Sequence, residues 1–134
     1  MTYLLDANAW IAYLRQNNAQ LVQRFLQVNP AEIGLCSVVL GELFYGAHHG
    51  AANKRASNLA LIGRLQQRFA SLPFDDLAAA EYGEIRAYLA AQGTPIGPND
   101  LMIASIARAN SLTLVTHNTH EFSRVPGLKL EDWQ

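Results

Sequence analysis

The sequence contains a single cysteine and few charged residues. Cys36 is the only cysteine among 134 residues, so an internal disulfide and a zinc site built from several thiolates are excluded. Charged residues make up 16% of the chain, and the formal net charge of -1 gives no overall attraction to nucleic acid. Any contact with nucleic acid must therefore depend on local groups or on a bound cation.

Long hydrophobic segments and targeting segments are also missing. No apolar run approaches the roughly 20 residues that span a bilayer. Asp6 interrupts the apolar start, and no basic region precedes it, so we expect no signal peptide, no membrane contact and a cytoplasmic location. Half of the residues are hydrophobic, which is enough for the core of a single domain over residues 1–134.

Short apolar runs alternate with amphipathic segments along the chain. Residues 2–5, 33–36 and 112–116 are predicted to be buried strands, and shorter strands are predicted at 72–74 and 128–130. Helices are predicted around residues 9–14, 21–26, 38–48, 53–70 and 77–91, and from residue 98 onward. Strands separated by helices favour a parallel sheet joined by crossover helices, an α/β sandwich.

Capping and periodicity predict several local details. Asn8 and Ser37 are expected to cap the helices that follow the first and second strands. Leu77 is expected on the buried face of its helix, and residues 117–121 are expected to form a polar turn.

Residues 94–107 combine a constrained loop with an apolar helix. Pro98 suits the first helical turn, and Asp100 follows it where exposed N–H groups favour negative charge. The helix is apolar or small on all sides through Ala107, so both of its faces are expected to be buried. An acid in such surroundings needs a cation or a hydrogen-bond network, whereas an ordinary helix-start acid is solvated.

Polar side chains follow the predicted strands at their carboxyl ends. Asp6 follows the first strand, Glu42 lies just past the second, and Asn118 and Glu121 follow the strand at 112–116. Parallel sheets bind ligands at this edge, so we expect these groups to meet Asp100 there. Two carboxylates about 4 Å apart repel by roughly 4 kcal/mol at an effective dielectric near 20, so the cluster needs a cation or protons. Oxygen ligands favour Mg²⁺ or Mn²⁺, and such a site favours metal-assisted phosphodiester hydrolysis.

Four segments resemble the PIN-domain ribonucleases, specifically the VapC-type toxins of bacterial toxin–antitoxin pairs. They read LLDAN at residues 4–8, SVVLGEL at 37–43, PNDLMIA at 98–104 and LVTHNTHEF at 114–122, in the family's order. The resemblance implies a three-layer α/β/α sandwich with a mostly parallel sheet. It also implies a Mg²⁺-dependent endoribonuclease that acts as a toxin and leaves a 5′-phosphate on the cleaved RNA.

The resemblance also implies a role for each acid. Asp6 and Asp100 would be the direct metal ligands, and Glu42 would complete the acidic triad, partly through water. Glu121 is interpreted as the fourth acid. The family often places an acid two residues after a Thr or Ser, and this chain has an asparagine there.

That asparagine, Asn118, follows Thr116, and both are interpreted as orienting groups beside the acids. The chain also departs from the family at Ala7, where a threonine is common, so a hydroxyl beside the first ligand is missing.

The implied partners are RNA, with tRNA and initiator tRNA as the expected substrates, and a cognate antitoxin that inserts a segment into the acidic groove. A homodimer is expected, with contacts from the helices between Asn8 and Val28 and from the long helix at 53–70. One face of that long helix is basic and is expected either to be solvated or to contact RNA phosphates. The basic residues are Lys54, Arg55, Arg64 and Arg68.

Three alternatives remain open from the residues. Asp6 after the first strand also fits an aspartyl-phosphate phosphotransfer domain, although residue 8 is Asn where a second acid is needed. Ala7 and the unassigned fourth acid are compatible with a non-catalytic binding module of the same fold. His117 and His120 beside Glu121 are compatible with a zinc site that lacks a clear further ligand.

Overall fold

Five parallel strands form the centre of the molecule. The computed structural model describes residues 1–134 and orders the strands β3-β2-β1-β4-β5. β1 pairs with β2 on one side and with β4 on the other, so Tyr3 lies between Ile33 and Thr113. The strands are β1 Tyr3–Leu5, β2 Ile33–Cys36, β3 Ser71–Leu72, β4 Thr113–Val115 and β5 Lys129–Glu131.

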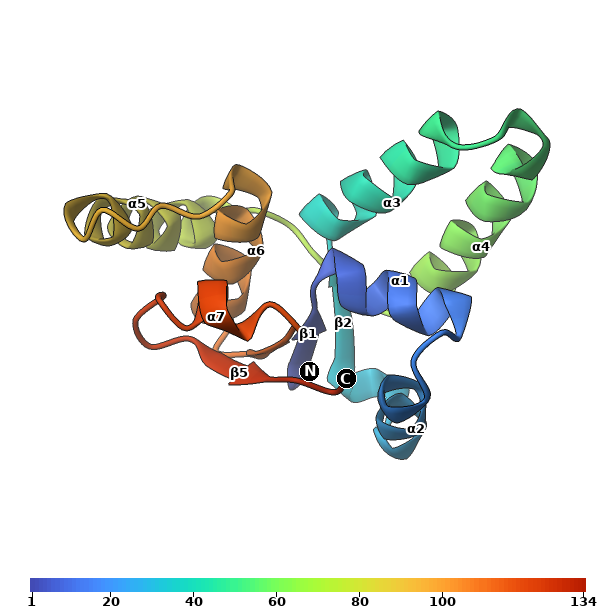
Figure 1. The fold of residues 1–134 in the computed structure, drawn as a ribbon, viewed down its shortest axis with the longest axis horizontal. Coiled ribbons are helices and arrows are strands. Elements are labelled where there is room, and N and C mark those ends of the chain that lie inside the picture. The colour runs from blue at the N-terminus through green and yellow to red at the C-terminus, as the bar shows by residue number, and fades with distance from the viewer.

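Seven helices cover the two faces of the sheet. They are α1 Ala7–Arg15, α2 Ala19–Gln27, α3 Ser37–His49, α4 Arg55–Arg68, α5 Asp76–Ala91, α6 Pro98–Ala109 and α7 Thr119–Phe122. Figure 1 shows α1 to α4 on one side of the sheet and α5 to α7 on the other. This arrangement confirms the predicted three-layer α/β/α sandwich with a parallel sheet.

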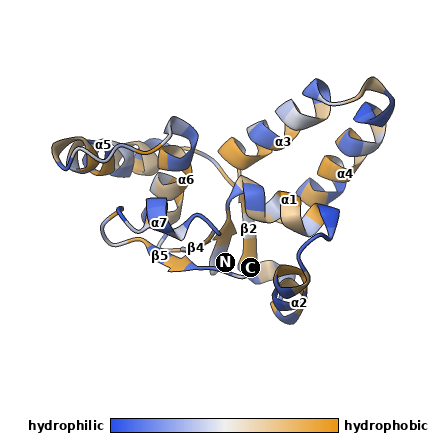
Figure 2. Ribbon diagram, in the orientation of Figure 1, coloured by the Kyte–Doolittle hydropathy of each residue, from blue (hydrophilic) through white to orange (hydrophobic).

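The core lies on both faces of the central strands. Leu4, Leu5 and Leu35 have no exposed surface, and Figure 2 shows the strands as the hydrophobic centre of the ribbon. In α6, Leu101 and residues 103–107 are buried, because this helix packs against both α5 and β4. The predicted burial of both faces of this helix is therefore confirmed.

Two predicted helix caps are wrong. The N-cap of α1 is Asp6, not Asn8, because the chain turns into the helix directly after β1. Ser37 is the first residue of α3, and the N-cap position is held by Cys36 without a side-chain hydrogen bond. The Ser37 hydroxyl instead accepts a hydrogen bond from the Phe74 N–H at 3.3 Å.

The phase of α5 also differs from the prediction. Asp75 caps this helix by accepting a hydrogen bond from the Ala78 N–H at 3.0 Å, and Ala78 is fully buried. Leu77 is 69% exposed as a result, because the cap turns the adjacent position outward.

Three element boundaries are corrected as well. Residues 119–122 of the predicted polar turn form the short helix α7. The strand predicted at 72–74 is Ser71–Leu72, and the helix predicted at 53–70 begins only at Arg55, after a 3-10 turn at Ala52–Lys54.

A largely buried arginine joins α5 and α6. Arg108 of α6 forms ion pairs with Glu81 and Glu84 of α5 and donates to the Pro126 carbonyl at 2.9 Å. The Arg108 side chain is 14% exposed, whereas those of Glu81 and Glu84 are 32% and 76% exposed, so the charge of a largely buried guanidinium is paired at the protein surface. The link holds α6, and with it Asp100, against α5. None of the helices has the length and apolar character needed to cross a membrane.

Candidate active site

Asp6 lies where the strand order reverses, between β1 and β4. Its Oδ1 accepts a hydrogen bond from the Ala9 N–H at 2.9 Å, and its Oδ2 accepts one from the Thr116 hydroxyl at 2.6 Å. The residue is 5% exposed. The same side chain therefore caps α1 and joins the carboxyl ends of two adjacent strands. Because Thr116, directly after β4, supplies a hydroxyl to Asp6, the missing hydroxyl at Ala7 does not leave this carboxylate without a donor.

Burial raises the pKa of the Asp6 carboxyl above its ordinary value of 3.8. The hydrogen bonds from Thr116 and Ala9 oppose this change, whereas the negative charges of Glu42 and Asp132 add to it. The environment thus disfavours an isolated negative charge but provides two donors that hold it in a fixed orientation.

Asp100 occupies the first turn of α6 and is half-buried. Burial is the largest cause that raises the pKa of its carboxyl to about 6, together with the negative charges of Glu121 and Asp6. The like charges show that the acids of this edge lie close enough to influence one another. A cation between them would remove this electrostatic penalty.

Glu42 enters the same edge from the second turn of α3. Its Oε1 accepts a hydrogen bond from the Asn99 Nδ2 at 2.9 Å, which connects α3 to the start of α6. Sequence reasoning assigned no role to Asn99, although it precedes Asp100 in one of the segments that resemble the family. The only sequence signal for Asn99 was its position next to Asp100.

Thr116, Asn118 and Glu121 form a chain of hydrogen bonds after β4. The Asn118 N–H donates to the Thr116 hydroxyl at 2.9 Å, and the Asn118 Nδ2 donates to the Glu121 Oε2 at the same distance. The Glu121 Oε1 accepts from the Gly97 N–H at 3.3 Å. The geometry therefore holds Glu121 beside the start of α6, with Asn118 as its donor.

The structure brings all four predicted acids to the carboxyl edge of the sheet, but it does not gather them tightly. No three acidic, histidine or cysteine side chains lie close enough together to form a ready-made metal cluster. The donors are nevertheless carboxylate oxygens, and burial and like charge raise the pKa of Asp100. This chemistry fits a hard divalent cation such as Mg²⁺ or Mn²⁺. The catalytic and metal-binding roles of these residues remain predictions.

The two histidines near Glu121 do not share a ligand set. The His117 Nδ1 lies 3.0 Å from the Asp132 Oδ2, whereas the His120 Nε2 lies 3.5 Å from the Arg124 Nη2. Because the two histidines contact different partners, their geometry disfavours a shared zinc site. Asp132 was missed by sequence reasoning, although it follows the last strand at the same edge as the other acids.

The four predicted basic residues are exposed and form no ion pair with an acidic side chain. They do not share one face as predicted, because Lys54 lies in the 3-10 turn before α4 and Arg55 lies nine residues before Arg64, on the opposite side of the helix. Arg55 donates to the His48 carbonyl at 2.9 Å, and the Arg68 guanidinium lies 5.4 Å from the centre of the Phe69 ring. None of these four basic residues takes part in the hydrogen bonds of the carboxylates. Contact of Lys54, Arg55, Arg64 and Arg68 with RNA remains a prediction.

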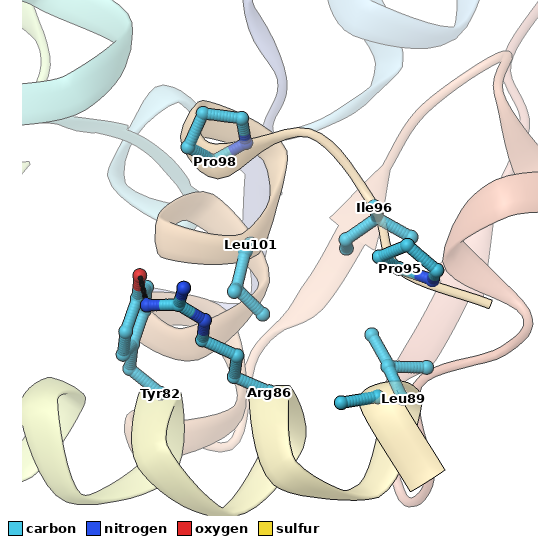
Figure 3. Close-up of a pocket in the computed structure, with 8 residues that line it drawn as sticks. Tyr82, Arg86, Leu89, Pro95, Ile96, Pro98 and Leu101 are labelled. Atoms are coloured by element: carbon cyan, nitrogen blue, oxygen red, sulfur yellow. Dashed lines mark hydrogen bonds between the residues drawn. The ribbon is translucent and has the colours of Figure 1, made fainter. Parts of the chain in front are cut away.

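A cavity of about 500 Å³ lies on the other side of α6, between this helix, α5 and residues 95–98. Figure 3 shows Tyr82 and Arg86 along α5, opposite Pro95 and Ile96, with Leu101 between them. Arg86 donates to the Tyr82 hydroxyl at 3.2 Å. The lining contains no acidic residue, so this cavity is separate from the carboxylate site.

Comparisons with known proteins agree with this arrangement. A family profile described as "PIN domain" matches residues 3–128. The chain is 43% identical over 133 residues to a protein of Shigella flexneri named "tRNA(fMet)-specific endonuclease VapC", which covers 99% of this chain and 98% of that protein.

Two solved structures are similar over the whole fold. A DNA-bound VapBC structure from Salmonella typhimurium is 38% identical, with a TM-score of 0.91, and covers 100% of this chain and 99% of that one. A structure of VapBC2 from Rickettsia felis, bound to a DNA fragment from its promoter, is 34% identical with a TM-score of 0.89 and covers 100% of both chains.

Proposed function

The chain belongs to the PIN-domain family, among the VapC ribonucleases, and from this premise we propose that it is a Mg²⁺-dependent endoribonuclease that cleaves tRNA. Similarity over nearly the whole chain places the protein among the ribonuclease toxins of VapBC-type pairs. The observation that supports the metal-dependent part is the group of four acids at one edge of the sheet, in which burial and like charge raise the pKa of Asp100 to about 6.

In this proposal Asp6 and Asp100 hold the cation. A divalent cation at this edge would polarise the scissile phosphodiester and activate the attacking water. Thr116 keeps the Asp6 carboxylate in one orientation through the bond at 2.6 Å. Asn99 fixes one oxygen of Glu42, which leaves the other to orient the water and accept its proton.

Glu121 contributes the fourth negative charge in the same proposal. Its two oxygens accept from the Gly97 N–H and from Asn118, so the carboxylate stays beside Asp100 while the loop before α6 is held in place. Asn118 therefore acts as a positioning group rather than as the fourth acid.

Initiator tRNA is the proposed substrate because the Shigella flexneri relative is named a tRNA(fMet)-specific endonuclease and aligns over 99% of this chain. With a net charge of -1, the chain has no general attraction to RNA, so phosphate contacts must be local. The proposed contacts are the exposed Lys54, in the 3-10 turn before α4, and the exposed Arg55, Arg64 and Arg68 of α4.

A cognate antitoxin is the proposed protein partner. A groove of about 280 Å³ between α1, α3 and α4 is lined by Glu42, by Arg15 and by apolar side chains that include Ile11, Leu14 and Ile62. An antitoxin segment with apolar side chains and one basic side chain would fill the groove and neutralise Glu42. Homodimer formation through α1, α2 and α4 remains a prediction; Leu26 of α2 is 71% exposed.

Incubation of the purified protein with a total tRNA pool tests the proposal. We expect cuts in the presence of Mg²⁺ or Mn²⁺ that disappear with EDTA and that leave 5′-phosphates, detected by direct ligation of an adapter. An intact tRNA pool with divalent binding by calorimetry would contradict the tRNA assignment and indicate another RNA. Neither cleavage nor cation binding would contradict the catalytic proposal and favour a non-catalytic binding module.

A further inference from the structure

A second groove begins directly at Glu42, on the side that faces α6. Its volume is about 330 Å³. It is lined by Val38, Gly41, Glu42 and Tyr45 of α3 and by Asn99 and Met102 of α6. Glu42 and Asn99 are hydrogen-bonded to each other, so the groove is continuous with the carboxylate edge. The function proposed above uses these two side chains but leaves the rest of the groove without a role.

An exposed aromatic ring forms one wall of this groove. Tyr45 lies one helical turn after Glu42, on the same face of α3, and is 66% exposed. Its ring stacks on His49, with 5.1 Å between the ring centres and an angle of 11° between the planes. The stack holds the ring in place without burying it, so most of the aromatic surface stays available to a ligand.

Gly41 lines the groove with backbone only and faces open space. A Cβ built at Gly41 would meet no atom within 4 Å. Gly41 has no positive φ, so the backbone of α3 does not require glycine here. Glycine inside a helix costs about 1 kcal/mol relative to alanine. A larger side chain at position 41 would therefore have room beside Glu42 without a clash.

We propose that this groove receives an unpaired nucleobase of the RNA substrate, stacked on Tyr45, while the adjacent phosphate lies at the carboxylates. The proposal rests on the function proposed above. Single-stranded RNA is recognised by stacking of splayed bases on exposed aromatic side chains. The Asn99 Nδ2 is engaged by Glu42, and its Oδ1 accepts no hydrogen bond, which leaves an acceptor for a base edge.

The composition of the groove favours a nucleobase. Its six lining residues combine the exposed ring of Tyr45 with the polar side chain of Asn99. A single base needs only one aromatic face and a few polar atoms. The neutral base also avoids repulsion by Glu42, whereas a phosphate in the groove would face that carboxylate directly.

Three variants test this proposal in tRNA cleavage assays. Tyr45→Ala is expected to raise KM about tenfold, which lies within the range for loss of one base–aromatic stack. Tyr45→Phe keeps the ring and should restore most of the affinity. Gly41→Leu fills the groove, improves helix propensity and should raise KM by a similar factor without loss of fold. Tyr88→Ala is the matched control, because Tyr88 is 44% exposed on α5 and does not line the groove.

A fluorescence measurement separates stacking from indirect structural effects. An RNA oligonucleotide spanning the mapped cut, with 2-aminopurine beside the scissile phosphate, is mixed with the protein in EDTA so that it is not cleaved. Stacking on Tyr45 should quench the probe in the wild-type protein and in Tyr45→Phe, but not in Tyr45→Ala or Gly41→Leu.

Three results would overturn the proposal, and they are distinguishable. If the wild type cleaves tRNA and the groove variants match Tyr88→Ala in KM and quenching, the function stands and the base site is wrong. If Tyr45→Ala and Gly41→Leu instead change the oligomeric mass by light scattering, the groove is a contact between copies of the chain. If the wild type neither cleaves nor binds RNA, the proposed function fails together with the base site.

Discussion

Replacement of Asp100 by Asn is expected to stabilise the metal-free protein while it removes cleavage. The pKa of the Asp100 carboxyl is raised to about 6 by burial and by the charges of Glu121 and Asp6. The folded protein therefore binds this proton more tightly than the unfolded chain, whose carboxyl titrates near 3.8. Above pH 6 the ionised carboxylate destabilises the fold, and the neutral amide of Asn removes that penalty.

The size of the effect follows from the displacement of the pKa. About two pKa units correspond to roughly 3 kcal/mol at most, at 1.36 kcal/mol per unit. The carboxyl of Asp100 is only half-buried, and solvent screening reduces the expected gain to about 1 kcal/mol at pH 7.5. The gain should shrink as the pH falls from 6 towards 4 and vanish only well below pH 3.8, where the wild-type carboxyl is protonated in both states.

Urea unfolding in EDTA at several pH values between 4.5 and 8 measures this difference. The control is Asp76→Asn, which removes an exposed acid from the first turn of α5 and should change stability by no more than about 0.5 kcal/mol at any pH. A loss of stability in Asp100→Asn at pH 7.5, or a gain that does not depend on pH, would refute the electrostatic reasoning.

Three further substitutions test the surroundings of the site. Thr116→Val removes one of two donors from the buried Asp6 and should cost about 1–3 kcal/mol in urea unfolding at pH 7.5; an unchanged midpoint would contradict that role. Arg108→Met should cost about 2 kcal/mol because it removes a largely buried guanidinium that pairs with the partly buried Glu81, whereas Glu84→Gln, at an exposed partner, should stay within about 0.5 kcal/mol. Glu121→Gln should weaken Mg²⁺ binding at least tenfold by calorimetry, and unchanged affinity would assign the fourth charge elsewhere.

The layers of the fold and the edge that carries the acids were predictable from the sequence, because both depend on local patterns. Apolar runs such as 33–36 and 112–116 have the length and composition of buried strands, and polar residues directly after them mark the carboxyl edge. The helix from Pro98 was identified from its proline and its uninterrupted apolar pattern, and its burial on both faces follows from that pattern.

The partners of the acids were not predictable, because they depend on contacts between distant residues. Asn99 meets Glu42 across 57 positions of the chain, and no local pattern records that pairing. Asp6 was identified as a site residue but not as a helix cap, since one carboxylate serves Ala9 and Thr116 at once. A sequence pattern that assigns one role to each residue misses such double use.

The rate of tRNA cleavage at increasing Mg²⁺ concentration, for the wild type and for Asp6→Asn, tests the central claim most directly. Asn also caps helices and keeps the shape of the side chain, so the substitution removes one negative charge without loss of the α1 cap. The account predicts Mg²⁺-dependent cleavage by the wild type and none by Asp6→Asn at any concentration. Equal rates for the two proteins, or wild-type cleavage that persists in EDTA, would contradict a cation held by the carboxylates.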